Sequence, residues 1–430
     1  MRYLDVMQDS LDYIEENLKT ELSAEELSRR AGFSQFHYCR LFQRLVGLSV
    51  KRYVVWRRLL WAAYAMAQGQ KQVEAALEYG FDTSAGFYKA FRRMFGYSPS
   101  DYVKRFKVTR PYSIDLTKER YNMIEHSRVK EVLKQWELTA ENIANLVYSG
   151  SGAINPNAFV INERYVLKAF SVLGKAQINV QIQKALCAKG LQEAVPITTK
   201  QGEEIVGDGE FFYLFMPKID GESLRAAEFY EGDSYAKAYE LGKVIGKLHQ
   251  VLKESDDIPC NERNIYEEVC KKWLEPAMQA LGLNEAFKWD YVDNFGQLQE
   301  QLSVQIIHRD PNPSNILWKE GNCAGFIDFD LAQRSIRLFD PCYAATAILS
   351  ESFEQPNEIW FEIFKGILHG YDSVAQLTEA EKKAIPYVVL SIQLICVGYF
   401  SQQEKFEQLA KTNVAMMKWL LENREKLEWD

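Results

Sequence analysis

Residues 306–318 read IIHRDPNPSNILW, and residues 325–333 read GFIDFDLAQ. The first segment holds Asp310 and Asn315 in the spacing H-x-D-x-x-x-x-N, and in the second Asp328 follows a predicted apolar strand. Transfer of a phosphoryl group requires phosphates held by a metal ion and a carboxylate at the attacking hydroxyl. Asn315 and Asp328 offer the oxygen ligands that Mg²⁺ prefers, and Asp310 can orient the hydroxyl and accept its proton. The two segments therefore predict a phosphoryl-transfer site, with Asp310 as catalytic base and with Asn315 and Asp328 as metal ligands.

Residues 145–170 read NLVYSGSGAINPNAFVINERYVLKAF, which is a pattern of strand, glycine turn, strand, tight turn and strand. Small residues in the glycine turn let backbone N–H groups approach phosphates; they are Ser149, Gly150, Ser151 and Gly152. Lys168 lies on the third strand, where its ammonium group would meet the α- and β-phosphates. A glycine turn or a strand lysine alone is an ordinary surface feature. In this order, and followed by the two downstream segments, they predict an α+β, bilobal, protein-kinase-like fold.

The chain from about residue 125 to 425 resembles the aminoglycoside phosphotransferase and choline-kinase-like family of small-molecule kinases. The resemblance implies ATP or GTP and Mg as cofactors and a hydroxylated small molecule as ligand or substrate. It also implies that Lys168 contacts phosphate and acts in catalysis. Residues 212–224, FYLFMPKIDGESL, resemble the hinge strand of that family, so backbone groups near Met216 and Lys218 would bind the nucleotide base. Asp340, which follows the metal motif, is expected to be structural.

One feature departs from the family pattern. Kinases of this family pair the strand lysine with a glutamate on the next helix, but residues 169–192 contain no acidic residue. Gln177, Gln181 and Gln183 occupy that region instead, and an amide brings no charge to the ammonium group. Two interpretations stay open: a domain that transfers phosphate, and a domain that binds nucleotide or ligand without turnover. Arg309 also replaces the usual glycine, without an evident reason in the sequence.

The N-terminal part has the opposite charge to the rest of the chain. Residues 28–110 contain 16 basic and 4 acidic residues, whereas the whole chain carries a net charge of −8. A compact basic block joined to an acidic body is typical of a module that binds a polyanion. The sequence therefore predicts a separate nucleic-acid-binding domain at this end.

The basic block contains an internal repeat of two short helices about a glycine turn. One copy reads AGFSQFHYCRLFQRLVGLS from Ala31, and the other reads YGFDTSAGFYKAFRRMFGYSP from Tyr79. A long connecting helix is predicted between them, ending at Gly69, and a final helix is predicted to start at Pro99. Helix-turn-helix units place their second helix in the major groove of DNA. The alternative is a helical bundle with a solvated basic face, but two copies of one frame favour DNA binding.

Side chains on the outward faces of the two second helices are the candidates for DNA contact. Arginine and glutamine can read base edges, and lysine and arginine can pair with phosphates. The candidates are Gln35, Phe36, Cys39, Arg40, Arg44, Ser84, Ala85, Tyr88, Lys89, Arg92 and Arg93. Residues 11–104 resemble the AraC-type DNA-binding domain, which implies two helix-turn-helix units that read two adjacent major-groove segments of double-stranded DNA. Such a chain binds without a dimer, although a homodimer is left open.

Length and composition agree with a multidomain globular protein. The 430 residues predict an all-α DNA-binding domain over 1–108, a linker over 109–124, and a kinase domain over 125–430, with its lobes divided near 220. Seven scattered cysteines, the acidic start of the chain and the lack of a long apolar span predict a cytoplasmic protein without membrane attachment. The predicted function is a transcription regulator whose kinase-like domain senses or phosphorylates a small molecule. The alternatives are a phosphotransferase with an accessory DNA-binding module, and a pseudokinase sensor.

Overall fold

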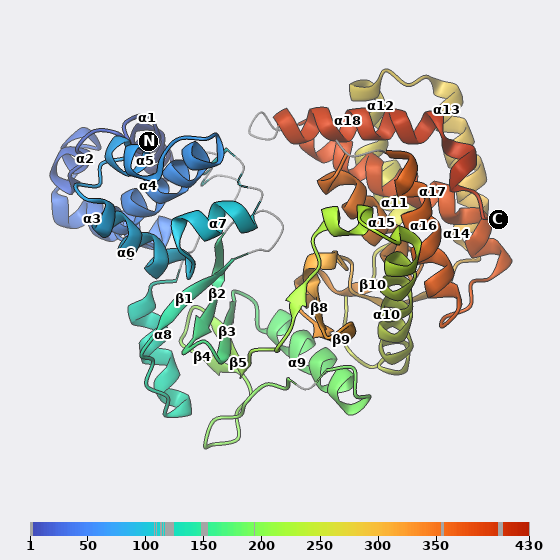
Figure 1. Ribbon diagram of the computed structural model, residues 1–430, viewed down its shortest axis with the longest axis horizontal. Coiled ribbons are helices and arrows are strands. Elements are labelled where there is room, and N and C mark those ends of the chain that lie inside the picture. The colour runs from blue at the N-terminus through green and yellow to red at the C-terminus, as the bar shows by residue number, and fades with distance from the viewer. Residues whose placement is uncertain are drawn as a thin grey trace. The chain divides into compact units, whose positions relative to one another are not determined.

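A computed structural model of the chain describes residues 3–106, 108, 110–111, 114, 116, 124–147, 154–192, 194–353, 357–402 and 407–429. The residues form two compact units, which are Met1–Ala176 with Pro196–Lys218 (unit 1) and Gln177–Val195 with Ile219–Asp430 (unit 2). A helical region is followed by an α+β domain with an antiparallel sheet, as the sequence predicts (Figure 1). The predicted linker 109–124 lies mostly outside the described residues, so the predicted domain boundaries remain predictions.

Seven helices among the described residues form the part of unit 1 for which the sequence predicts DNA binding, called the DNA-binding module below. They are α1 (Tyr3–Glu16), α2 (Ala24–Arg30), α3 (Gln35–Val46), α4 (Val50–Ala67), α5 (Gln72–Glu78), α6 (Ser84–Phe95) and α7 (Pro99–Arg105). The two predicted second helices are α3 and α6, and each begins with a side-chain cap, from Ser34 and from Thr83. Each ends at a glycine with positive φ, Gly47 at 81° and Gly96 at 76°, a conformation that glycine adopts without steric strain. The predicted repeat is therefore confirmed, including the connecting helix α4.

Aromatic residues form the core of this module. Phe42 of α3 packs edge-on against Tyr53 of α4 at 5.6 Å between ring centroids, and Phe91 stacks on Phe95 within α6 at 4.4 Å. All four side chains are fully buried. Buried aromatic pairs stabilise a fold through both buried area and ring geometry, so the inward faces of α3 and α6 are fixed by this core.

The rest of unit 1 is the N-lobe, defined here as helix α8 (His126–Leu133) and a five-stranded antiparallel sheet. Its strands are β1 (Ile143–Val147), β2 (Ile154–Ile161), β3 (Tyr165–Phe170), β4 (Val206–Gly207) and β5 (Phe212–Pro217), in the spatial order β1-β2-β3-β5-β4. Asn162 and Glu163 both have positive φ in the turn between β2 and β3, which is the geometry of a tight hairpin that follows the twist of the strands. The three predicted strands and the tight turn between β2 and β3 are therefore confirmed, whereas the predicted glycine turn at residues 149–152 lies outside the described residues.

Unit 2 is mostly helical. Its helices are α9 (Leu173–Ala188, most of which lies in this unit), α10 (Ser234–Glu254), α11 (Ile265–Glu268), α12 (Leu274–Leu281), α13 (Glu285–Asp290), α14 (Gly296–Gln299), α15 (Phe339–Glu351), α16 (Asn357–Asp372), α17 (Glu379–Phe400) and α18 (Glu407–Glu422). Helices α10 and α16 cross at close range because glycines lie at the contact. A Cβ atom on Gly242 would lie 2.0 Å from the carbonyl oxygen of Ile367, and one on Gly370 would lie 2.0 Å from that of Tyr239.

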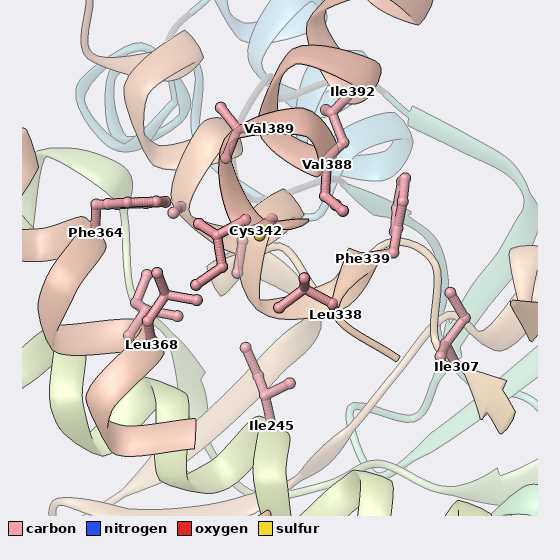
Figure 2. Packing of buried hydrophobic residues seen from close by; sticks show 14 of the residues in the cluster. Ile245, Ile307, Leu338, Phe339, Cys342, Phe364, Leu368, Val388, Val389 and Ile392 are labelled. Atoms are coloured by element: carbon pink, nitrogen blue, oxygen red, sulfur yellow. The ribbon is translucent and has the colours of Figure 1, made fainter. Parts of the chain in front are cut away.

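The largest hydrophobic core lies between these helices. Figure 2 shows side chains from α10, α15, α16 and α17 directed toward one another around Cys342, which is fully buried. Helix α17 is long and apolar enough to cross a membrane by length and composition, but 67% of its most apolar window is buried inside the protein. A helix at the centre of a core has the same composition, so this feature is weak evidence for a membrane span.

Two short sheets in unit 2 carry the loops of the predicted phosphoryl-transfer site. One pairs β7 (Val304–Ile307) with β10 (Gln333–Ile336), and the other has the order β6-β8-β9, formed by β6 (Glu222–Ser223), β8 (Ile316–Lys319) and β9 (Asn322–Phe326). The segment that contains Asp310 and Asn315 leaves β7 and enters β8, and Asp328 follows β9. The strand ends therefore bring the two predicted segments together.

Candidate phosphoryl-transfer and DNA-recognition sites

The loop that follows β7 is held by one buried carboxylate. Asp340, fully buried in the first turn of α15, accepts hydrogen bonds from the backbone N–H of His308 at 2.8 Å and of Arg309 at 3.0 Å. The carboxylate also lies 2.9 Å from Nε2 of His249, on α10. Such hydrogen bonds to an ionised acceptor are among the stronger ones in proteins. Asp340 therefore has a structural role, as the sequence predicts: it holds in place the backbone of the two residues directly before Asp310.

Asp310 lies at the centre of a hydrogen-bonded cluster. Its carboxylate accepts from Nδ2 of Asn312 at 2.6 Å and from Nδ2 of Asn315 at 3.2 Å, and the hydroxyl of Tyr343 also interacts with it. Burial raises the pKa of the Asp310 carboxyl, and the nearby negative charge of Asp328 acts in the same direction. A raised pKa makes a carboxylate a stronger base toward a hydroxyl proton.

Asn315 joins Asp310 to the segment that contains Asp328. The Asn315 carbonyl accepts a hydrogen bond from the N–H of Ile327 at 3.0 Å, and its Nδ2 also donates to the carbonyl of Asp310 at 2.9 Å. Asp328 itself adopts a left-handed backbone conformation, with φ 67° and ψ 57°. Non-glycine residues in this region are uncommon and concentrate at functional sites. The structure thus brings together the three predicted residues Asp310, Asn315 and Asp328 within unit 2.

The same hydrogen bonds show which side-chain atoms remain to bind magnesium. Because Nδ2 of Asn315 donates to Asp310, the amide oxygen is the atom of that side chain left for a metal ion. Among the described residues no group of three or more His, Cys, Asp or Glu side chains is placed to hold a metal. Mg²⁺ sites at bound phosphates need only one or two protein ligands, since phosphate and water supply the rest. The donor set of Asn315 and Asp328 therefore fits magnesium.

The predicted nucleotide-contacting residues belong to unit 1. Lys168 lies on β3, opposite Ala158 of β2 and Leu214 of β5, with its Nζ 5.3 Å from the ring centroid of Phe170. Met216 lies on β5, and the backbone N–H of Lys218 already donates to the carbonyl of Arg164 at 2.8 Å. Pro217 has no N–H and the N–H of Lys218 is already bonded, so this part of the hinge offers a nucleotide base carbonyl groups more readily than N–H donors. The predicted phosphate turn, Ser149, Gly150, Ser151 and Gly152, lies outside the described residues.

Two residues near Asp310 gain a physical account that the sequence did not provide. Arg309 has φ 72°, and its guanidinium group stacks 4.0 Å from the ring centroid of Phe339, with Glu268 at 3.9 Å. Tyr343 was missed as a site residue. A signal was present, because Tyr343 lies three residues after Asp340 and positions i and i+3 share one helix face.

Helix α9 places a side-chain amide next to the segment that contains Asp328. Asn179 is fully buried, and its Nδ2 lies 3.4 Å from Oδ1 of Asp330, two residues after Asp328. Gln183, one of the three glutamines noted in the sequence, is also buried. Within unit 2, helix α9 therefore reaches the segment that contains Asp328 through Asn179, a residue that the sequence motifs did not single out.

The outward faces of α3 and α6 are placed as predicted. On α3, Tyr38 and Phe42 are fully buried while Phe36 is 74% exposed. On α6, Phe87 and Phe91 are fully buried. The remaining candidates Gln35, Arg40, Arg44, Ala85, Tyr88, Lys89, Arg92 and Arg93 are exposed, and Cys39 and Ser84 are partly exposed. Each helix therefore presents a polar and basic face with an aromatic residue within it, which suits contact with DNA.

Two different protein families match the N-terminal part of the chain and the part that follows it. A helix-turn-helix domain model matches residues 27–105, and the model of the phosphotransferase enzyme family matches residues 148–377, more than half of the chain. An uncharacterized HTH-type transcriptional regulator of Bacillus subtilis, YbfP, is 30% identical over 146 residues, which are 33% of this chain and 45% of that protein. Homoserine kinase of Phenylobacterium zucineum is 24% identical over 287 residues, which are 62% of this chain and 81% of that enzyme.

Among solved structures, the amicoumacin kinase hAmiN in complex with AMP-PNP, Ca²⁺ and Ami has a similar fold. Its TM-score is 0.52 at 17% sequence identity, and the match covers 70% of this chain and 93% of that chain. At this identity the likeness shows the fold alone. That complex holds a nucleotide analogue and a divalent cation together with the ligand.

Proposed function

The chain belongs to the phosphotransferase enzyme family and carries an AraC-type helix-turn-helix domain, and from this premise we propose that it is a DNA-binding transcription regulator whose second domain transfers phosphate to a small molecule. The observation that carries the proposal is the cluster of Asp310, Asn315 and Asp328, joined by the hydrogen bond from Ile327 to Asn315. A domain that only senses its ligand has no need for a buried carboxylate beside two metal-binding side chains.

The residues of the chain define the proposed reaction. The acceptor hydroxyl oxygen attacks the γ-phosphorus of ATP or GTP, and the bond to the β–γ bridging oxygen breaks, which yields a phosphate monoester and a nucleoside diphosphate. Asp310 orients the hydroxyl and takes its proton, and Asp340 holds the backbone before Asp310 in place. Asn315 and Asp328 would hold magnesium, which neutralises phosphate charge when bound. Lys168 and the hinge at Met216 and Lys218 would bind the nucleotide.

The acceptor is a hydroxylated small molecule. The related homoserine kinase acts, by its name, on homoserine, a small amino acid with a hydroxyl group, which supports this class and no single member of it. Binding of the acceptor and nucleotide in the cytoplasm would then change the activity of the DNA-binding module at a promoter. The protein would be both a regulator and an enzyme.

A turnover assay tests the phosphotransferase part. Purified protein with ATP or GTP, Mg²⁺ and a panel of amino alcohols, hydroxy acids and sugars should release nucleoside diphosphate with at least one acceptor. Asp310→Asn should lower the rate by about 10²–10⁴-fold, the usual contribution of a general base. Asp257→Asn, the same chemical change at an exposed position of unit 2, should have no effect. Nucleotide binding without turnover on any acceptor would refute the transferase proposal.

A sensor without turnover is the second candidate. It is favoured by the lack of any acidic residue over residues 169–192, so that helix α9 carries no glutamate. In that case calorimetry would detect binding of nucleotide or ligand without any turnover. Asp310→Asn would then change neither this binding nor the binding of DNA.

The proposed DNA contacts are the outward side chains of α3 and α6, which would read two adjacent major-groove segments. Protein-bound fragments selected from genomic DNA would identify a site, and anisotropy would give its affinity. Lys89→Ala should weaken binding and reduce its dependence on salt, because a released phosphate contact changes the salt slope. Lys253→Ala, an exposed cation of unit 2, is the matched control. If the two variants bind DNA with equal affinity, Lys89 does not contact DNA.

A further inference from the structure

The N-lobe packs directly on the DNA-binding module within unit 1. Helix α6 contacts strand β1, and a Cβ atom built on Gly96, at the end of α6, lies 3.6 Å from the Cβ of Ala144 (Figure 1). The backbone N–H of Ser49, at the start of α4, donates to Oε1 of Glu125 at 3.1 Å. The N-lobe thus reaches the C-terminal end of α6 and the residues that follow α3.

Charged groups line this contact. The electrostatic surroundings of Arg52 include Glu125 and Arg93, and those of His126 include Arg52 and Arg93. Nε2 of His126 lies 3.1 Å from Oδ1 of Asn145 on β1. Burial lowers the pKa of His126 to about 4, so the ring is neutral beside the two arginines at pH 7. Arg93, a candidate DNA contact, is therefore also part of the N-lobe contact.

A hollow of about 650 Å³ separates helix α3 from the N-lobe. Its α3 side includes Phe36, Arg40 and Arg44, which are all candidate DNA contacts, and the lining continues to Gly47 at the end of the helix. The opposite wall includes Glu125, Arg128 and Glu210. Nε of Arg128 binds Asp208 and Nη1 binds Glu210, each at 2.6 Å, so its charge is compensated and the carboxylates dominate the wall.

A DNA duplex needs the space that this wall occupies. A helix in the major groove has a sugar–phosphate strand on each side. Helix α3 has 12 residues and is therefore about 18 Å long, a length along which one strand carries about five phosphates. On the N-lobe side these phosphates would meet Glu125 and Glu210 across a space much smaller than a duplex. Steric overlap and charge repulsion act together against DNA in this arrangement.

We propose that the docked N-lobe and DNA compete for helix α3, so that the arrangement seen here is closed to DNA and recognition of an operator requires undocking. The proposal rests on the proposed DNA-binding function. It gives the phosphotransferase domain a direct way to regulate DNA binding, because any ligand that favours one of the two arrangements shifts the population between them.

A disulfide trap tests the proposal in the full chain. The Cβ separation at Gly96 and Ala144 falls in the range of disulfides, about 3.5–4.5 Å, so the Gly96→Cys and Ala144→Cys double variant can be locked by mild oxidation. The oxidised form should bind a selected DNA site at least about 100-fold more weakly than the same protein after reduction. The comparison within one variant cancels any strain at Gly96. The two single variants and the wild type, oxidised in parallel, control for the native cysteines.

Equal affinity of the oxidised and reduced double variant would overturn the proposal, because DNA would then bind the docked form. If the reduced variant and the wild type both fail to bind any DNA, the proposed DNA-binding function is wrong and this proposal falls with it. The two failures are therefore distinguishable.

A second variant does not depend on cysteine chemistry. Glu125→Gln removes the charge that binds the Ser49 N–H and faces Arg52, so it should favour undocking and raise DNA affinity up to about 10-fold. Glu131→Gln, on helix α8, which begins directly after Glu125, is the control: this side chain is exposed and paired with Lys134, so the change should leave affinity unchanged. No difference between the two variants would contradict the proposed competition.

Discussion

The substitution Asp340→Asn separates the anchoring of the loop from the chemistry at Asp310. The Asp340 carboxylate accepts hydrogen bonds from three donors: the N–H groups of His308 and Arg309, and Nε2 of His249. Asparagine has one carbonyl oxygen. If that oxygen takes the position of Oδ2, two bonds persist and the new NH₂ group opposes the N–H of Arg309.

The expected magnitude follows from these bonds. A buried donor left without a partner costs about 1–3 kcal/mol, and the two remaining bonds weaken because the acceptor loses its charge. Together these effects lower the free energy of unfolding of unit 2 by about 2–4 kcal/mol. With a urea m value of about 3 kcal/mol per M, the midpoint falls by about 1 M. Displacement of the Asp310 carboxylate by about 1 Å would lower turnover about 100-fold.

Urea unfolding followed by tryptophan fluorescence measures the stability, and six of the nine tryptophans lie in unit 2. Turnover on the best acceptor measures the displacement of Asp310. Asp257→Asn is the control for the chemical change at an exposed site. If Asp340→Asn matches this control in both midpoint and rate, Asp340 does not anchor the loop and the account of the site is wrong.

Three further predictions concern single side chains. Tyr343→Phe removes a hydrogen bond that lowers the pKa of Asp310, so the pKa of this carboxyl should rise. The acid limb of the kcat/KM profile should therefore move to higher pH. An unmoved limb would show that Tyr343 does not contact Asp310. Arg40→Ala should weaken specific DNA binding about 5- to 150-fold and random duplex much less, as competition anisotropy would report, and an equal loss on both would exclude base reading. His126 has a folded pKa of about 4 against 6.5 for the free side chain, so the unfolded chain takes up the proton first. Unit 1 should therefore lose about 1 kcal/mol of stability from pH 6.5 to about pH 5, and His126→Asn should remove that part of the slope in urea titrations.

Local features of the fold were predictable from the sequence because they depend on residues a few positions apart. The caps of α3 and α6 join residues i and i+3, and the glycines that end these helices act through their own φ angles. Asp310 and Asn315 lie only five positions apart in the chain. Composition and periodicity are sufficient for such elements, since the physics is contained in the segment itself.

Long-range pairings were not predictable in this way. Asp340 accepts from His249, 91 residues away, and the amide of Ser49 from the DNA-binding module meets Glu125 of the N-lobe. Arg309 looked unexplained in the sequence because its partner, the ring of Phe339, lies 30 residues further on. Such contacts depend on how strands and helices pack, which single-sequence patterns do not encode.

The amino-acid sequence by itself determined that this protein has a duplicated helix-turn-helix unit and the motif of Asp310, Asn315 and Asp328, because spacing and side-chain chemistry are properties of the linear chain. Only the tertiary structure decided that Asp340 and Tyr343 set the environment of Asp310, and that the N-lobe packs on α6 and faces α3 across a hollow. Those facts arise from the packing of surfaces that are far apart in the chain. The free energy of such packing depends on buried area and on charges brought close in space.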